Sequence, residues 1–291
     1  MTGAITAGVD GTAESLAALD WAAREAVRRG LALRIVHAWR FQQYDTIGSV
    51  DRESQGQGAR ALADEAARTV AERHPGLDVS TAVPEGGIAD TLARAAADSE
   101  MLALGSRGHG PVVGFLLGSV GRQVVAETDV PVVLVRAGDR ASTEAAGREI
   151  VVGQQGGPDD SHAVLRFAFE TAAVRSATVR VVRAWTLPPL FAYSPSSLKL
   201  LDEAGGLEPY EKSALAEAVR PWRERFPDVP VVEHVEMGSA GQVLLSVAGT
   251  AQLMVVGRRA HRTAVGARVG SVTHGMLHHA ECPVAVVPHT S

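Results

Sequence analysis

The sequence predicts an α/β protein built from two doubly wound domains in tandem. Short apolar runs alternate with segments whose apolar residues recur at helical spacing, which is the pattern of a mainly parallel sheet with helices on both faces. The same order of segments occurs twice within the 291 residues. A chain of this length can bury two cores, so each copy is expected to fold as its own domain.

The two copies match at several separate places. Residues 4–11 (AITAGVDG) correspond to residues 149–156 (EIVVGQQG), and residues 34–39 (RIVHAW) correspond to residues 180–185 (RVVRAW). The stretch between the copies is polar and lacks apolar periodicity, which is typical of a linker. We therefore place the first domain at residues 1–137, the linker at 138–147 and the second domain at 148–291.

The elements of the first copy follow in order. We expect strands at residues 5–9, 31–39, 77–83, 101–104 and 131–135. We expect helices at residues 15–29, 59–74 and 88–98, and a further helix that opens at Gly118-Ser119, while residues 40–58 are expected to be irregular. Gly30 and Pro75 mark the ends of the first two helices.

A glycine-rich loop follows the fourth expected strand. Its spacing is Gly105-x2-Gly108-x9-Gly118-Ser119, and glycine allows backbone geometry and close approach that a side chain would block. Gly118-Ser119 then opens a helix, whose first backbone N–H groups have no partner within the helix. Because these groups and the helix dipole together favour an anion, the loop is suited to hold phosphate.

This spacing resembles the nucleotide-binding motif of the universal stress protein family. Residues 5–10 resemble the first strand of that family, residues 35–39 its second strand and residues 130–135 its last strand. The resemblance implies that each domain is flavodoxin-like (adenine nucleotide alpha hydrolase-like), with a five-stranded, doubly wound sheet in the order 3-2-1-4-5. In that order a crevice lies between the first and fourth strands, where Asp10 and Gly105 would meet.

The resemblance also implies an ATP site in the first domain. Asp10 and the backbone near Val9 would hold the adenosine, and the glycine-rich loop would wrap the ribose and phosphates. The implied ATP-binding residues are Gly8, Val9, Asp10, Ala38, Leu104, Gly105, Arg107, Gly108, Gly118, Ser119 and Val120. Simpler interpretations stay open: Asp10 as a turn former or helix N-cap, Ala38 as a small packed residue, and the glycines as an ordinary turn.

The second domain departs from this motif at two positions. Gln155 stands in place of Asp10, which removes a charged hydrogen-bond acceptor, and Ala260 stands in place of Gly108. Arginines crowd the loop, where they would hold a polyphosphate or only be solvated. Nucleotide binding stays open here, and the candidate second site consists of Gly153, Gln155, Ala184, Val256, Gly257, Arg259, Gly270, Ser271 and Val272.

The resemblance implies an ATP-binding, nucleotide-dependent regulator in bacterial stress response or dormancy. ATP occupancy would fix the loop at residues 107–117 and bias assembly or partner choice. Mg²⁺ would bind through the phosphates rather than through protein side chains. Hydrolysis needs a positioned base and usually a metal held by carboxylates, and residues 105–120 include no Asp or Glu. We expect no catalytic residues. The alternatives are a slow ATPase or nucleotidyl transferase, and an interaction protein that binds no nucleotide.

The composition of the chain argues against nucleic acid and membranes as binding partners. The net charge of −5 gives no electrostatic reason to expect nucleic acid or an anionic membrane, and no stretch reaches transmembrane length. The single cysteine, Cys282, permits no intrachain disulfide, which fits a cytoplasmic location. Besides ATP, the expected partners are a second copy in a homodimer and an unknown regulatory protein. His274, His278 and His279 recur at helical spacing, and this pattern favours a polar helix surface over a metal site.

The last strands of the two domains are both apolar. Residues 130–135 (VPVVLV) and 282–287 (CPVAVV) would lie at sheet edges in this family, and an uncovered hydrophobic edge promotes aggregation. We therefore expect these two strands to pair with each other within the chain. Association of whole chains would then use other surfaces.

Overall fold

A computed structural model describes residues 3–43, 51–106, 118–137, 148–187, 206–259 and 269–289. The chain divides into two compact units, which are described separately. The first unit comprises Met1–Ser142 together with Arg262–Val269 and Pro283–Val286. The second unit comprises Thr143–His261, Gly270–Cys282 and Val287–Ser291.

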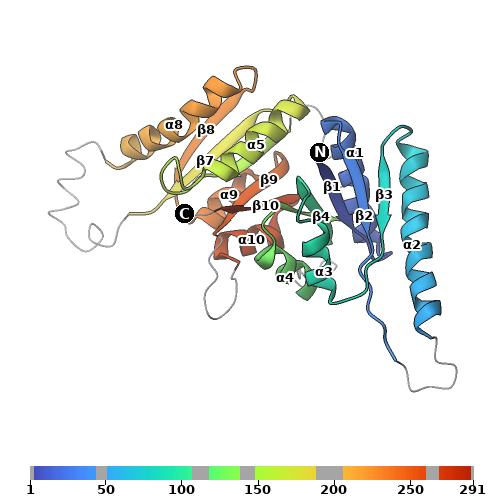
Figure 1. The fold of residues 1–291 in the computed structure, drawn as a ribbon. Coiled ribbons are helices and arrows are strands. Elements are labelled where there is room, and N and C mark those ends of the chain that lie inside the picture. Colours follow the sequence, from blue (N-terminus) through green and yellow to red (C-terminus); the bar gives the residue numbers. More distant parts are fainter. Residues whose placement is uncertain are drawn as a thin grey trace. The chain divides into compact units, whose positions relative to one another are not determined.

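The first unit is a doubly wound sheet with the strand order β3-β2-β1-β4-β5, as predicted (Figure 1). All neighbouring pairs among these five strands are parallel. Helices α1 and α2 contact each other, as do α3 and α4, which fits right-handed crossovers with one helix pair on each face. The elements are β1 (Ala4–Gly8), α1 (Ala13–Arg29), β2 (Ala32–Val36), α2 (Arg52–Arg73), β3 (Val79–Ala82), α3 (Ile88–Ala95), β4 (Met101–Ser106), α4 (Ser119–Glu127) and β5 (Val132–Arg136).

Helix α1 places its N-terminus at the carboxyl end of β1. Thr12 is its N-cap, and the Thr12 hydroxyl accepts a hydrogen bond from the backbone N–H of Ser15 at 3.3 Å. Gly30 ends the helix in a left-handed conformation with φ 64°. Ala18 and Leu19 are buried on the face that packs against the sheet. The first turn of α1 is thereby fixed beside the predicted crevice.

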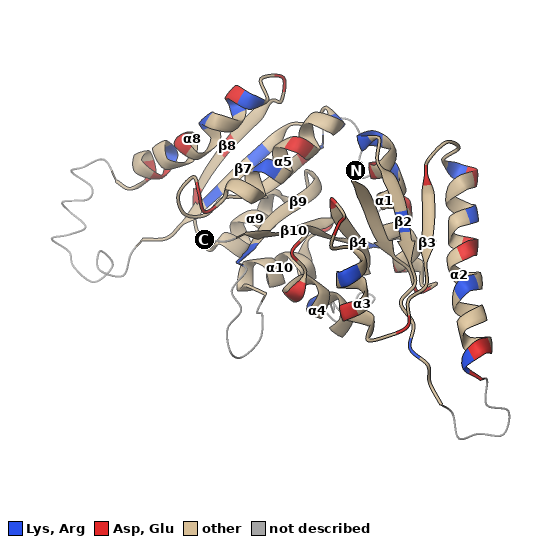
Figure 2. Cartoon of the chain, in the orientation of Figure 1, with Lys and Arg blue, Asp and Glu red and all other residues tan. Residues whose placement is uncertain are grey.

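Helix α2 starts earlier than predicted, because residues 52–58 are helical rather than irregular. Asp51 caps the helix by accepting a hydrogen bond from the backbone N–H of Ser54 at 2.7 Å. Gly56, which suggests a loop in the sequence, instead packs against Trp39, where an added Cβ would lie 3.3 Å from the ring. Figure 2 shows acidic and basic residues spread along α2, which packs its small buried residues against β2 and β3.

The second copy repeats this topology with the strand order β10-β9-β6-β7-β8; Val284–Val286 of β10 belong to the first unit and the rest of that strand to the second. Residues 9–12 connect β1 to α1, whereas the longer segment 154–161 connects the corresponding β6 and α5. The elements are β6 (Glu149–Gly153), α5 (His162–Arg175), β7 (Val179–Trp185), α8 (Glu208–Arg225), β8 (Val231–Met237), α9 (Ala240–Ala248), β9 (Ala251–Arg259), α10 (Ser271–His279) and β10 (Val284–His289).

The edge of β5 is covered within the first unit. Val284–Val286, which belong to that unit, pair antiparallel with β5 so that Ala285 lies opposite Val133. The two apolar strands therefore pair within the chain, as the sequence predicts. Backbone N–H and C=O groups at the outer edge of β5 are thereby paired instead of left open.

Among the described helices, none combines the length and the apolar character that crossing a bilayer requires.

Candidate functional site

A cavity of about 220 Å³ opens at the carboxyl ends of β1 and β4 in the first unit. This is the crevice position expected for a doubly wound sheet at the point where strand order reverses. Two predicted residues, Arg107 and Gly108, lie outside the described residues. All the other predicted residues line the cavity: Gly8, Val9, Asp10, Ala38, Leu104, Gly105, Gly118, Ser119 and Val120.

Several lining residues were not predicted from the sequence. Ile88 and Leu92 of α3 add an apolar wall that continues from Leu104. The start of α1 adds Thr12, Glu14 and Ser15, and α4 adds Gly121. The spacing of Thr12 and Ser15 before an apolar helix is a capping signal that could have identified this part of the wall. The cavity thus joins an apolar surface to a rim with the two carboxylates of Asp10 and Glu14.

Asp10 organises the turn between β1 and α1. Its Oδ1 accepts hydrogen bonds from the Thr12 backbone N–H at 3.0 Å and from the Thr12 hydroxyl at 2.5 Å. The Asp10 backbone N–H donates to the hydroxyl of Ser15 at 3.2 Å. Asp10 is therefore a turn former, whereas the N-cap is Thr12. These bonds also hold an exposed carboxylate at the rim of the cavity.

The backbone of Val9 is paired within the protein. Its N–H donates to the carbonyl of Val36 at 2.9 Å, and its carbonyl lies 2.8 Å from His37 Nδ1. Neither Val9 nor Asp10 therefore offers a spare backbone donor to a nucleoside. His37 was not predicted from the sequence. Its ring holds the carbonyl group of Val9, directly after β1.

Two cavity glycines have different structural roles. An added Cβ at Gly105 would lie 2.5 Å from the carbonyl carbon of Glu14 and 2.6 Å from the backbone nitrogen of Ser15, so helix α1 needs glycine there. Gly118 has φ −56°, and among the described residues no atom lies within 4 Å of an added Cβ, so its backbone conformation suits a side chain. Gly118 precedes the first amides of α4, and Ser119, Val120 and Gly121 line the cavity there. These helix-start amides form the part of the cavity that suits an anion.

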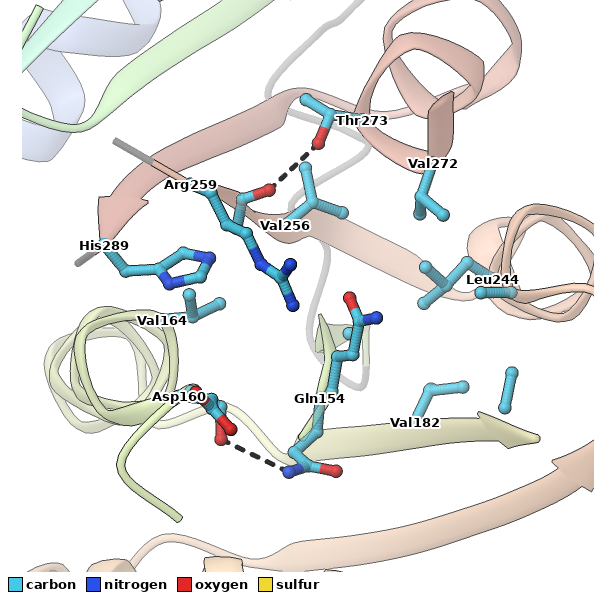
Figure 3. Close-up of a pocket in the computed structure, with 16 residues that line it drawn as sticks. Gln154, Asp160, Val164, Val182, Leu244, Val256, Arg259, Val272, Thr273 and His289 are labelled. Carbon is cyan, nitrogen blue, oxygen red and sulfur yellow. Dashed lines mark hydrogen bonds between the residues drawn. The ribbon is translucent and has the colours of Figure 1, made fainter. Parts of the chain in front are cut away.

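The second unit has a corresponding cavity of about 170 Å³ (Figure 3). Seven of the nine predicted residues line it: Gly153, Gln155, Ala184, Val256, Gly257, Arg259 and Val272. Gly270 and Ser271, at the start of α10, do not line it, although Val272 and Thr273 of that helix do. The Thr273 hydroxyl donates to the carbonyl of Gly257 at 3.0 Å, which ties α10 to β9.

A buried hydrogen-bond network supports the floor of the second cavity. The amide nitrogen of Gln154 donates to the carbonyl of Gly156 at 3.0 Å, and its amide oxygen accepts from Arg183 at 2.6 Å. Arg183 also forms an ion pair with Glu211 at 2.6 Å. Gln154 corresponds to Val9, so this polar network has replaced an apolar strand end. The sequence shows the change from Val to Gln but not its partners, which come from distant elements.

His289, at the end of β10, is a further lining residue that sequence reasoning missed. Burial lowers its pKa, the charges of Arg259 and Arg258 lower that pKa further, and the charge of Asp160 opposes them. Figure 3 shows the guanidinium group of Arg259 directed into the cavity near the His289 ring. This end of the second cavity therefore carries positive charge next to an ionisable ring.

The described part of the chain contains no group of three His, Cys, Asp or Glu side chains placed to hold a metal ion. On α10 the ring centroids of His274 and His278 are 4.2 Å apart, and those of His278 and His279 are 6.3 Å apart. A pair of imidazoles on one helix supplies fewer ligands than a closed structural site requires.

The comparisons with known proteins agree with this architecture. The model of the family described as the universal stress protein family matches residues 1–136 and 147–288. A universal stress protein of Mycolicibacterium smegmatis is 32% identical over 298 residues, covering 97% of this chain and 96% of the relative. The crystal structure of a universal stress protein from Archaeoglobus fulgidus DSM 4304 has a TM-score of 0.72 at 16% identity and covers 99% of both chains, so the fold is shared. A universal stress protein solved in complex with cAMP matches 46% of this chain and 97% of its own, with 24% identity and a TM-score of 0.38. The chain belongs to the universal stress protein family.

Proposed function

We propose that the first domain binds ATP and that the protein is a nucleotide-dependent regulator rather than an enzyme. The observation that carries this proposal is the convergence of segments far apart in sequence on one cavity. The strand ends at Asp10 and Gly105 and the helix start at Gly118 all line it. These are the parts that a nucleotide site at a doubly wound sheet combines.

The chemistry of the lining fits the parts of ATP. Ile88, Leu92 and Leu104 offer an apolar surface for the adenine ring. Asp10 lines the cavity, where its carboxylate would accept hydrogen bonds from ribose hydroxyls, and the first amides of α4 would suit phosphate oxygens. Mg²⁺, bound through the phosphates, would neutralise part of their charge. ATP occupancy would then bias assembly, including homodimer formation, or the choice of a regulatory partner in the cytoplasm.

The lining also supports an alternative from another class. Glu14 and Asp10 bring two carboxylates to the cavity, although the glycine-rich loop itself contains none. Carboxylates can position Mg²⁺ or a water molecule, so a slow ATPase is the second candidate. We favour binding because Asp10 Oδ1 already accepts two hydrogen bonds within its turn. Purified protein incubated with Mg²⁺ and ATP should leave ATP intact for far longer than a turnover of about 1 s⁻¹ would allow.

A paired substitution tests ATP binding. Gly118→Val would place a β-branched side chain at the phosphate end of the first cavity, and an added Cβ there meets no atom of the described residues within 4 Å. Gly270→Val is the matched control, because Gly270 caps α10 with similar geometry, φ −62°, and also has open space around an added Cβ. Both variants should keep the circular dichroism spectrum of the parent protein.

The first measurement is the mass of ligand released from protein purified without added nucleotide, followed by equilibrium dialysis with ATP. We expect ATP to bind the parent chain and Gly270→Val, and Gly118→Val to lose that binding. Equal ATP binding by all three proteins would reject the phosphate assignment. If no nucleotide is released and none binds, the nucleotide-free interaction protein becomes the better description.

A further inference from the structure

We propose that the cavity of the second domain is a separate binding site for a compact organic anion, whose charged group is held between Arg259 and His289. The ligand class is an apolar or aromatic body that carries a single phosphate or carboxylate. This inference concerns the second cavity and does not rest on ATP binding in the first.

The lining of the second cavity divides into an apolar and a charged part. Val182, Leu244 and Val256 line the space with apolar side chains, and Val164 adds a further apolar side chain next to the His289 ring. Arg259 and His289 stand together on the other part of the lining, with Asp160 and Gln155. An apolar body with a charged end matches this division, because small-molecule sites combine an apolar lining with a few polar groups that fix orientation.

His289 supplies the observation that calls for a ligand. Its Nδ1 is buried and has no hydrogen-bond partner among the described residues. A buried polar nitrogen without a partner is unfavourable, and an acceptor oxygen on a ligand would satisfy it. The His289 ring is also held close to β9, since an added Cβ on Gly257 would lie 2.9 Å from its Cδ2 and Nε2.

Arg259 supplies the charge. Arg259 is an exposed residue that lines the cavity, and among the described residues no ion pair joins its guanidinium group to a carboxylate. A guanidinium group binds carboxylate and phosphate through parallel hydrogen bonds, so it suits either anion. Asp160, which lines the same cavity, favours a ligand with one anionic group over a polyphosphate.

The two copies differ at the residue that makes this site. By the correspondence of residues 130–132 with 282–284, His289 stands where the first domain has Ala137. In the first domain, Gly105 packs against the backbone of α1, whereas Gly257 faces the His289 ring and Val164. The later start of α5 leaves this space to the ring. Arg259 itself corresponds to Arg107, which lies outside the described residues.

Binding at this site should be linked to protonation. Burial and the neighbouring charges of Arg259 and Arg258 keep the pKa of His289 below its usual range, and Asp160 only partly offsets them. A bound anion would favour the protonated ring, so ligand binding takes up a proton and affinity increases as pH falls. At neutral pH the unliganded ring is expected to be uncharged.

The test uses the full chain and three probes that share one ring: phenyl phosphate, benzoate and uncharged benzamide. Binding is measured by ligand-observed NMR, with the His ring signals of the protein as a site-specific readout. The variants are Arg259→Gln and His289→Asn, and Arg166→Gln is the matched control, because Arg166 is exposed on α5 and lies outside the cavity lining. Gly118→Val reports whether any binding belongs to the first cavity.

We expect at least one anion to bind with a dissociation constant of about 1 mM or below, and benzamide to bind at least about tenfold more weakly. Arg259→Gln should weaken anion binding about tenfold or more, whereas Arg166→Gln and Gly118→Val should leave it unchanged. Binding of phenyl phosphate alone would identify a phosphate ligand, and binding of benzoate alone a carboxylate ligand; binding of both would indicate an organic anion of either kind.

Benzoate keeps its charge between about pH 6 and 8, so its pH dependence reports on the protein. In the parent chain its affinity should increase toward pH 6, and His289→Asn should remove that increase. The proposal fails if neither anion binds, if benzamide binds as tightly as the anions, or if Arg259→Gln binds them as the parent does. Failure here would leave the ATP result for Gly118→Val untouched, so the two proposals are separable.

Discussion

Gly105 and Gly257 occupy corresponding positions near the ends of β4 and β9, and single substitutions there should have unequal effects. An added Cβ at Gly105 meets the backbone of Glu14 and Ser15, which cannot move without shifting α1. An added Cβ at Gly257 meets the side chains of His289 and Val164, which can rotate away.

We therefore expect Gly105→Ala to lower the free energy of unfolding by about 1–3 kcal/mol and Gly257→Ala to lower it by less. The entropic gain from replacing glycine in the unfolded chain is common to both variants and cancels in the comparison. Urea unfolding followed by circular dichroism measures the difference. Equal loss of stability in the two variants would contradict the close packing of Gly105 against the backbone of α1.

Asp10 has two roles that substitution can separate. Asp10→Asn retains an oxygen that can accept the hydrogen bonds from Thr12, but it loses the charge. If the carboxylate binds ribose hydroxyls, Asp10→Asn should weaken ATP binding while thermal stability stays close to that of the parent. Asp10→Ala should weaken ATP binding by roughly 1.5–3 kcal/mol and also destabilise the turn. Unchanged ATP affinity in both variants would show that Asp10 only stabilises the turn and does not bind ATP.

At this scale the sequence predicted the motif residues but not the residues that converge on them. Gly118 was predicted from the spacing of the glycine-rich loop and Asp10 from the resemblance of residues 5–10 to the family's first strand, and both line the cavity. Glu14, His37 and His289 were missed because their roles depend on contacts between distant elements, and an ordinary Glu in a first helical turn or a terminal His carries no such signal.

At the scale of elements, an ion pair joins β2 to the end of α3. Arg34 Nη1 donates to Asp98 Oδ1 at 2.7 Å, and Arg34 Nη2 donates to Asp98 Oδ2 at 3.2 Å. Arg34 Nη1 also donates to the carbonyl of Ala95, the last residue of α3, at 2.8 Å. The hydrogen bond from Arg34 is the main cause that lowers the pKa of Asp98, and the charge of Arg34 adds to it.

Because the pKa of Asp98 is lower in the folded state, the pair stabilises the protein above the unfolded value of 3.8, and this stabilisation is lost as pH falls through the folded value. Asp98→Asn should therefore reduce stability to urea at neutral pH, and its difference from the parent should vanish under acid conditions. Asp129→Asn, at an exposed carboxylate, serves as the control. A difference between Asp98→Asn and the parent that stayed constant with pH would contradict the ion pair.

Element types were predicted better than element boundaries. The early start of α2 was missed because Gly56 and Gly58 read as loop residues, whereas the Asp51 cap and the close packing on Trp39 stabilise the additional turns. The strand expected at 31–39 is regular only at Ala32–Val36, although Trp39 still forms an isolated parallel bridge with Glu85, and Ala38 between them lines the cavity. Burial at a site and burial in a strand look alike in sequence.

At the scale of the whole molecule, the two copies should respond differently to ATP. A ligand stabilises the state that binds it, by about 2.7 kcal/mol at a concentration 100 times its dissociation constant. Backbone hydrogen exchange of the full chain should then slow in β1, β4 and the start of α4 when ATP is added. The corresponding β6, β9 and α10 should change little. Equal protection of both halves would show that ATP also occupies the second cavity.

The repeat and the family resemblance together were sufficient to predict the strand order of both units. Sequence correspondence does not show how far the two cavities have diverged, because the changes at Gln154 and His289 act through partners on other elements. The shared fold is thus readable from the sequence, while the chemistry of the second cavity required the structure.

The pairing of β5 with Val284–Val286 also sets the order in which the protein can mature on the ribosome. Val133 of β5 can pair only after its partner Ala285 has been synthesised. At about 5–20 residues per second, the roughly 150 residues between them take about 8–30 s to make. During that interval the outer edge of β5 is available to a chaperone or to another nascent chain. Sequence-distant closure of this kind slows folding, so the first domain is completed only after nearly all of the second has been synthesised.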